Sequence, residues 1–163
     1  MKEIWDAYKK DGTLAGIDLV RGEPIPNGLF HIVGCVMVRH VDGSYLLMQR
    51  DKDKQNYPGF WELGASGSVL KGETPLQGAE RELLEECGIT SDGLELICVT
   101  KSDGVFYYNY LYITGCSKDS ITLQKGETIA YRWVSREGLL SFVHSENCID
   151  MQKKRWLPYL DRI

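Results

Sequence analysis

One short segment near the middle of the chain constrains the fold most, because it carries the signals for both ends of a helix. Thr74 is a favourable N-cap residue, Pro75 suits the first helical position, and Gln77 can close a capping box with Thr74. Gly88 favours the left-handed backbone conformation that ends many helices. The sequence therefore predicts a helix at residues 75–87.

The rest of the chain is dominated by strand signals, which are runs rich in β-branched and aromatic residues separated by turn residues. Strands are expected at residues 28–40, 45–49, 93–100, 105–114 and 129–134. One further helix should begin after Ser135, and another should run from about residue 145 to 156 because Pro158 disfavours its continuation. Helices that interrupt a mixed set of strands indicate an α+β fold, an α/β/α sandwich with the sheet in the middle.

The composition limits the class of protein. The chain has 163 residues, the size of one domain with a sizeable core, so we expect a single domain over residues 1–163. Its 19 basic and 23 acidic residues give a net charge of −4, which provides no general basic field to bind a nucleic acid duplex. There is no membrane-spanning apolar run, no signal peptide and no CxxC pair among the five cysteines. These features favour a cytoplasmic protein that does not bind a membrane. The sequence has no heptad pattern, so it predicts no particular oligomeric state.

Three glutamates crowd one side of the predicted helix. With a rotation of about 100° per residue, Glu82, Glu85 and Glu86 fall within one sector of its surface. Like charges at this spacing repel, and acids near a helix C-terminus oppose the helix dipole, so the arrangement brings no stability. One interpretation is a solvated acidic face, and the other is a site for a hard divalent cation, which prefers oxygen ligands. The opposite side carries an apolar seam that should pack on the sheet, formed by Leu76, Ala79 and Leu83.

The spacing of the whole segment favours the metal site. Residues 67–89 read GSVLKGETPLQGAERELLEECGI and match every defined position of the pattern G-x5-E-x7-R-E-U-x-E-E-x-G-U, where U is an aliphatic residue. This segment resembles the signature box of the Nudix hydrolase family. The resemblance implies a Nudix fold with the helix 75–87 as its catalytic helix. It also implies a metal-dependent pyrophosphohydrolase that cleaves a diphosphate linkage, usually in a nucleoside diphosphate joined to another moiety.

The same resemblance implies roles for residues within the box. The ligands of a Mg²⁺ or Mn²⁺ ion would be three carboxylates and one backbone carbonyl, from Glu82, Glu85, Glu86 and Gly67. Arg81 would orient the glutamates, and its position four residues before Glu85 allows contact. The substrate would be a small-molecule diphosphate.

Two residues outside the box complete the predicted site. The family often adds a carboxylate from a later loop shortly before a tryptophan, and Glu127, six residues before Trp133, suits that position. Glu127 would be a metal ligand or the general base, and an ordinary acid in a surface loop is the alternative. Arg50 closes a predicted strand, where it could bind a phosphate oxygen with two hydrogen bonds or simply be solvated.

The chain upstream of the box has a second and less specific resemblance. It looks like the Nudix branch that includes isopentenyl-diphosphate isomerase, at Glu3-Ile4-Trp5-Asp6, Arg21-Gly22, His31 and Tyr57-Pro58-Gly59-Phe60-Trp61-Glu62. An isomerase-like enzyme is therefore the first alternative. That isomerase uses a cysteine as acid and base where this chain has Ser66, and a serine hydroxyl is poor in both roles. It also lacks the full R-E-U-x-E-E run, so hydrolysis is favoured.

A non-catalytic module with the Nudix fold that binds a nucleotide is the second alternative. Such modules usually have gaps among the acids of the box, whereas this box is intact. The aromatic strand 105–112 bears on the same question, because alternation places four rings on one of its faces: Phe106, Tyr108, Tyr110 and Tyr112. These rings could stack a base or pack beneath a helix, and packing is the favoured interpretation.

Overall fold

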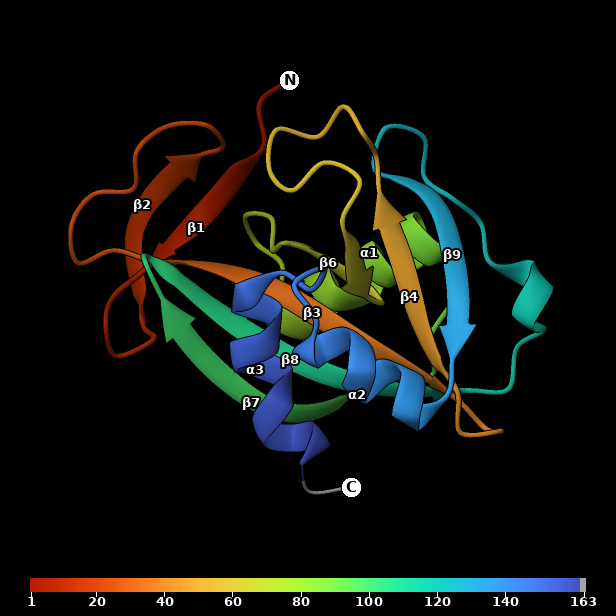
Figure 1. Cartoon of the computed structure of the whole chain (residues 1–163). Coiled ribbons are helices and arrows are strands. Elements are labelled where there is room, and N and C mark those ends of the chain that lie inside the picture. The colour runs from red at the N-terminus through yellow and green to blue at the C-terminus, as the bar shows by residue number, and fades with distance from the viewer. Residues whose placement is uncertain (162–163) are drawn as a thin grey trace.

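The structure is a computed structural model that describes residues 1–161, so the end of the predicted domain, residues 162–163, lies outside the described residues (Figure 1). In chain order its elements are β1 (Ile4–Tyr8), β2 (Leu14–Val20), β3 (His31–His40), β4 (Tyr45–Arg50), β5 (Trp61–Leu63), β6 (Ala65–Ser68), α1 (Pro75–Cys87), β7 (Glu95–Ser102), β8 (Val105–Thr114), the 3₁₀ turn η1 (Lys118–Ser120), β9 (Thr128–Val134), α2 (Arg136–His144) and α3 (Asp150–Leu160). None of the helices in this part of the chain has the length and apolar character needed to cross a bilayer.

The centre of the molecule is a mixed seven-stranded sheet. Its main path runs β5-β4-β3-β8-β7, with β6 paired to β3 and β9 paired to β4. The long central strands β3 and β8 run parallel, whereas the other pairs are antiparallel. Helix α1 lies on one face of the sheet, and α2 and α3 lie on the other (Figure 1). The predicted α+β sandwich with a mixed central sheet is therefore confirmed.

Alternation along β3 builds the two apolar layers that join the sheet to its helices. Val36 points into a fully buried cluster that contains Leu83 of α1. Its neighbour Met37 points the opposite way, into a cluster that contains Leu139 of α2 and Trp156 of α3. Such a strand is covered on both faces, which explains why its sequence is a nearly continuous apolar run.

The aromatic strand β8 follows the interpretation favoured from the sequence. Tyr110 and Tyr112 are buried in the same cluster as Leu83, and Tyr108 packs against it. Phe106 lies at the start of the strand and pairs instead with Phe30, with 4.9 Å between ring centroids. Most of the aromatic face of β8 is thus core beneath α1.

The C-terminal helix departs from the prediction. The expected helix at 145–156 is wrong in both bounds, because α3 spans Asp150–Leu160 and contains Pro158. A proline lacks the N–H that would bond one turn back, but only two helical residues follow this one. Trp156 and Leu160 are each 1% exposed, so their packing against the sheet stabilises the last turn.

An N-terminal hairpin lies outside the sequence prediction altogether. Strands β1 and β2 form a separate two-stranded sheet, which the bridge between Tyr8 and Phe30 connects to the main body. Trp5 of the hairpin stacks on His31 at the start of β3, with 4.3 Å between ring centroids. Most residues of β2 are exposed, and one of them is Gly16. The strand therefore has little of the apolar alternation that marks a half-buried strand.

Helix α1 approaches the sheet so closely that one position of β3 has no room for a side chain. A Cβ atom on Gly34 would lie 2.9 Å from the Cβ of Ala79 and 3.0 Å from its Cα and nitrogen. These atoms are a helix backbone and a methyl group, neither of which can rotate away. The glycine therefore sets the distance between α1 and the sheet.

We predict that Gly34→Ala lowers the free energy of unfolding by about 1 to 3 kcal/mol, because the added methyl group overpacks this contact. Urea denaturation measures the change. The matched control is Gly115→Ala, where the nearest atom to a new Cβ would be 3.9 Å away, and we expect little change there. Equal stabilities for the two variants would contradict the close approach of α1.

Candidate active site

Helix α1 is stabilised at both ends as the sequence predicts. The Thr74 hydroxyl accepts a hydrogen bond from the Gln77 N–H at 3.2 Å, and the Thr74 N–H donates to the Gln77 side chain at 2.9 Å. Gly88 has a φ of 71°, and its N–H donates to the Leu84 carbonyl at 2.9 Å. The predicted helix 75–87 is confirmed at its exact bounds.

The buried face of α1 matches the predicted seam only in part. Ala79 and Leu83 are buried, but Leu76 in the first turn is 40% exposed. Gly78 makes the contact near that end of the helix, where a Cβ would be 2.8 Å from a methyl group of Val69. Glu86, which the sequence placed on the acidic side opposite the seam, is only 5% exposed because its direction on the helix is close to that of Ala79.

One cavity of about 370 Å³ gathers the residues that the sequence singled out. Helix α1, strand β6, the end of β4 and the loop before β9 all contribute to its wall. Every predicted catalytic, ligand or phosphate-binding residue lines it, namely Arg50, Gly67, Arg81, Glu82, Glu85, Glu86 and Glu127. Residues 77 positions apart in the chain thus share one small space, and six of these seven residues have ionisable side chains.

Gly67 gives the Glu82 carboxylate its position. A Cβ on Gly67 would lie 2.1 Å from the carboxyl carbon of Glu82, so any larger residue here would displace this carboxylate from the backbone of β6. The pairing of Gly67 with Gly34 places both glycines under the same stretch of α1. A backbone strand and a carboxylate therefore meet in the cavity with no side chain between them.

Arg81 is the main cation of the cavity wall. Its Nε donates to Glu73 at 2.8 Å, and one Nη donates to Glu82 at 2.6 Å and to Glu85 at 3.3 Å. The other Nη donates to the Ser68 carbonyl at 2.9 Å and to Glu73 at 3.1 Å. The hydrogen bonds with Glu73 and Glu82 raise the pKa of Arg81. This guanidinium therefore contacts three carboxylates at once, those of Glu73, Glu82 and Glu85.

In the part of the chain that the structure describes, the Glu86 carboxylate has no such ion pair. Burial raises the pKa of Glu86 well above its usual range, and the neighbouring charges of Glu62 and Glu82 raise it further. The only hydrogen bond to the Glu86 carboxylate within residues 1–161 comes from the Ser66 N–H, at 3.0 Å. Burial also raises the pKa of Glu82, although Arg81 offsets part of this effect. The ionised form of Glu86 is therefore disfavoured in this cavity, and a further positive charge beside it would favour that form.

Arg50 is held in place by a residue that sequence reasoning did not select. One Nη donates to Glu62 at 2.9 Å, while Nε and the other Nη donate to the Asn56 carbonyl at 3.2 and 3.1 Å. Glu62 is 4% exposed and also accepts a hydrogen bond from Gln152 of α3 at 3.0 Å. Its signal in the sequence was an acid between apolar residues in a short strand, which predicts a buried and paired carboxylate.

Glu127 is ion-paired with Lys54, and both side chains line the cavity. The loops that carry them are joined by the backbone, because the Asp51 N–H donates to the Glu127 carbonyl at 2.8 Å. Lys54 was not selected from the sequence, since a single lysine in a loop rich in charged residues gives no distinctive signal.

The N-terminal hairpin also reaches the site. Glu3, Trp5 and Arg21 line the cavity, and Arg21 donates to Glu3 at 2.6 Å. An adjoining cavity of about 460 Å³ shares Trp5, Arg21, Arg50 and Lys54 with the first. The hairpin thus adds a cation and a ring to one edge of the site.

Within residues 1–161, no three acidic, histidine or cysteine side chains stand in the arrangement of a ready metal site. The contacts above give the physical reason. Arg81 draws Glu82 and Glu85 toward itself, and Lys54 does the same to Glu127. The oxygen atoms are in one cavity, but in this state they face the cations of the chain.

Comparison with known proteins identifies the family. A family model described as the NUDIX domain matches residues 29–159. An uncharacterized Nudix hydrolase of Listeria monocytogenes is 36% identical over 143 residues, which cover 84% of this chain and 82% of that protein. The isopentenyl-diphosphate Delta-isomerase of Corynebacterium diphtheriae is 28% identical over 126 residues, or 71% of this chain and 69% of that protein. The crystal structure of DR0079 from Deinococcus radiodurans superposes with a TM-score of 0.72 at 19% identity, covering 86% of this chain and 88% of that one.

The chain belongs to the Nudix hydrolase family. The family and the class of enzyme predicted from the signature box are confirmed, and so is the more distant likeness to isopentenyl-diphosphate isomerases. The hairpin of β1 and β2 lies before the residues that the family model matches.

We predict that Arg81→Met lowers the free energy of unfolding by about 2 kcal/mol, because it leaves partly buried carboxylates without their counter-charge. The control is Lys71→Met, which breaks a pair with Asp18 whose two side chains are 53% and 46% exposed. Such exposed pairs contribute at most about 1 kcal/mol. Urea denaturation of both variants makes the comparison, and an Arg81 variant as stable as the Lys71 variant would contradict the account of the cavity wall.

Proposed function

We propose that this chain is a metal-dependent pyrophosphohydrolase that cleaves the diphosphate linkage of a small molecule, of the kind in which a nucleoside diphosphate is joined to another moiety. The observation that carries the proposal is the cavity of about 370 Å³ in which the glutamates of α1 meet Gly67, Arg50 and Glu127. This constellation offers oxygen ligands for a cation beside guanidinium groups for an anion.

The proposed metal ligands are the carboxylates of Glu82, Glu85 and Glu86, with the carbonyl of Gly67 and with Glu127 as a further candidate. Two observations support the fit of Mg²⁺ or Mn²⁺. The donor set consists of oxygen atoms, which these hard cations prefer. The raised pKa values of Glu82 and Glu86 reflect buried negative charge that a cation would offset.

The side chains of the cavity supply the remaining parts of the reaction. When bound, a divalent cation neutralises phosphate oxygens and lowers the pKa of the attacking water. Arg50 is already fixed by Glu62 and Asn56, and it retains N–H groups that can bind a phosphate oxygen. A carboxylate then accepts the proton of the attacking water, either Glu127 or a glutamate of α1. Glu127 would have to leave Lys54 to act, and Lys54 would then be available to the substrate.

The isomerase-like alternative concerns the same cavity, and a feature of its wall argues against it. Ser66 occupies the position of the isomerase cysteine and lines the cavity, where its backbone N–H binds Glu86. A hydroxyl group at this position is too weak an acid to exchange protons with an unactivated carbon. Mass analysis of products separates the alternatives, because hydrolysis adds a water to the substrate whereas isomerisation leaves its mass unchanged.

We predict that Glu85→Gln lowers the rate of diphosphate hydrolysis by roughly a hundredfold or more, since several kcal/mol of transition-state stabilisation depend on the metal. A screen of nucleoside diphosphate compounds with product identification by mass provides the assay. Glu80→Gln is the matched control on the same helix, because Glu80 binds the Ser91 hydroxyl at 3.0 Å and does not line the cavity. Equal losses in the two variants, or none in Glu85→Gln, would defeat the assignment of the ligand.

A second prediction concerns the metal itself. Metal at ten times its dissociation constant should stabilise the native state by about 1.4 kcal/mol, which raises the melting temperature by about 3 to 6 °C for a chain of this size. Thermal denaturation of metal-free protein with added MgCl₂ or MnCl₂ measures the shift. Glu86→Gln should abolish the shift and Glu80→Gln should retain it. A shift of the same size in Glu86→Gln would place the ion elsewhere.

A further inference from the structure

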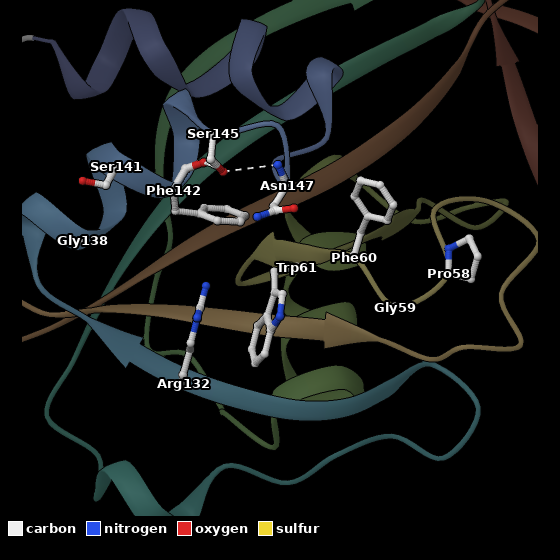
Figure 2. Close-up of a pocket in the computed structure, with 10 residues that line it drawn as sticks. All are labelled: Pro58, Gly59, Phe60, Trp61, Arg132, Gly138, Ser141, Phe142, Ser145 and Asn147. Atoms are coloured by element: carbon white, nitrogen blue, oxygen red, sulfur yellow. Dashed lines mark hydrogen bonds between the residues drawn. The ribbon is translucent and has the colours of Figure 1, made fainter.

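A second cavity lies beside Trp61 of β5, between the sheet and α2 with the loop that follows it (Figure 2). Its volume is about 620 Å³, within the range of sites for small organic molecules. We call it the Trp61 cavity, and the residues that matter below are Phe60, Trp61, Arg132, Ser141, Phe142 and Asn147. It shares no lining residue with the candidate active site or with the cavity that adjoins that site.

Arg132 is placed to bind an anion. Its guanidinium carbon lies over the Trp61 ring, 4.4 Å from the ring centroid, which is a cation–π contact. A cation–π contact engages the charge of the guanidinium and needs none of its N–H groups as hydrogen-bond donors, so they can bind a carboxylate or a phosphate. Within residues 1–161 the Arg132 side chain makes no hydrogen bond and no ion pair, and the cavity lining contains no acidic residue. The contact with Trp61 also restricts the Arg132 side chain before a ligand binds, which lowers the entropic cost of binding.

The rest of the wall combines aromatic rings with polar side chains. Figure 2 shows Phe60, Trp61 and Phe142 around the cavity, with Asn147 between Phe142 and Phe60 in this view. The Asn147 segment is held in place, because its N–H donates to the Ser145 hydroxyl at 3.3 Å and the next residue bridges to Trp61. The carboxamide of Asn147 forms no hydrogen bond within residues 1–161, and it can read the polar edge of a ring.

We propose that the Trp61 cavity is a second ligand site, which binds a small molecule that joins a planar ring to an anionic group, as a nucleoside monophosphate does. The ring packs among Phe60, Trp61 and Phe142, and its polar edge faces Asn147. The anionic group binds the in-plane donors of Arg132, with the Ser141 hydroxyl as a further donor. The proposal does not depend on the hydrolase reaction, because the two sites have no residue in common.

The test is a titration of metal-free, ¹⁵N-labelled protein with adenosine 5′-monophosphate, followed by NMR. We expect the signals of the Trp61 indole N–H and the Asn147 carboxamide to shift, and Arg132→Gln to weaken binding by about tenfold or more. The matched control is Arg39→Gln, because Arg39 also stacks on a ring, that of Tyr45, but lies in neither cavity. Adenosine and ribose 5-phosphate separate the contributions of the ring and the phosphate, and each should bind more weakly than the intact nucleotide.

Three outcomes would overturn the proposal. The first is the absence of any shift at Trp61 and Asn147 with millimolar nucleotide. The second is equal affinity in the wild-type protein and Arg132→Gln. The third is affinity that falls in Arg50→Gln but not in Arg132→Gln, which would place the nucleotide in the candidate active site. Retained affinity in Arg39→Gln together with loss in both Arg132→Gln and Asn147→Ala supports the site as described.

Discussion

The close contact between α1 and the sheet is the constraint on which the site depends. At Gly34 a single added carbon would press on the helix backbone, and at Gly67 it would occupy the space of the Glu82 carboxylate. Because the helix lies this near, side chains on its buried edge reach over the end of β6 instead of pointing into solvent. Glu82 and Glu86 enter the cavity for that reason, and the capping interactions at Thr74 and Gly88 fix where along the sheet they do so.

The balance of charges in the cavity is the second constraint on the site, and it follows from the close contact between α1 and the sheet. A helix that brings several carboxylates into a small cavity must offset their repulsion. Arg81 does so for the outer carboxylates, and Lys54 does so for Glu127 on the facing loop. Glu86 lies beyond the reach of both, which is why burial raises its pKa so far. We infer that the site is built to accept one more positive charge, and that the contacts with Arg81 and Lys54 hold its carboxylates until that charge arrives.

The sequence predicted the parts of the molecule that local chemistry decides. The caps of α1 are set within a few residues of one another, so its bounds could be read directly. The long strands β3 and β8 are buried on both faces, so their apolar runs were visible as well.

Pairing over long distances was harder to foresee. The hairpin of β1 and β2 is held by the stack of Trp5 on His31 and by the bridge between Tyr8 and Phe30, contacts between segments that no local pattern connects. Glu62 was missed for the same reason, since its partners Arg50 and Gln152 come from other elements. Pro158 misled the prediction of α3 because tertiary packing of Trp156 and Leu160 outweighs the lost backbone hydrogen bond.

The central claim is that the carboxylates on α1 serve a divalent cation, and anomalous diffraction from crystals grown with MnCl₂ tests it most directly. The account predicts one or more manganese peaks in the cavity, in contact with Glu82, Glu85 and Glu86 and with the carbonyl of Gly67, with the carboxylates turned from Arg81 toward the metal. Manganese bound only at other acidic residues, with Glu82 and Glu85 still on Arg81, would contradict it.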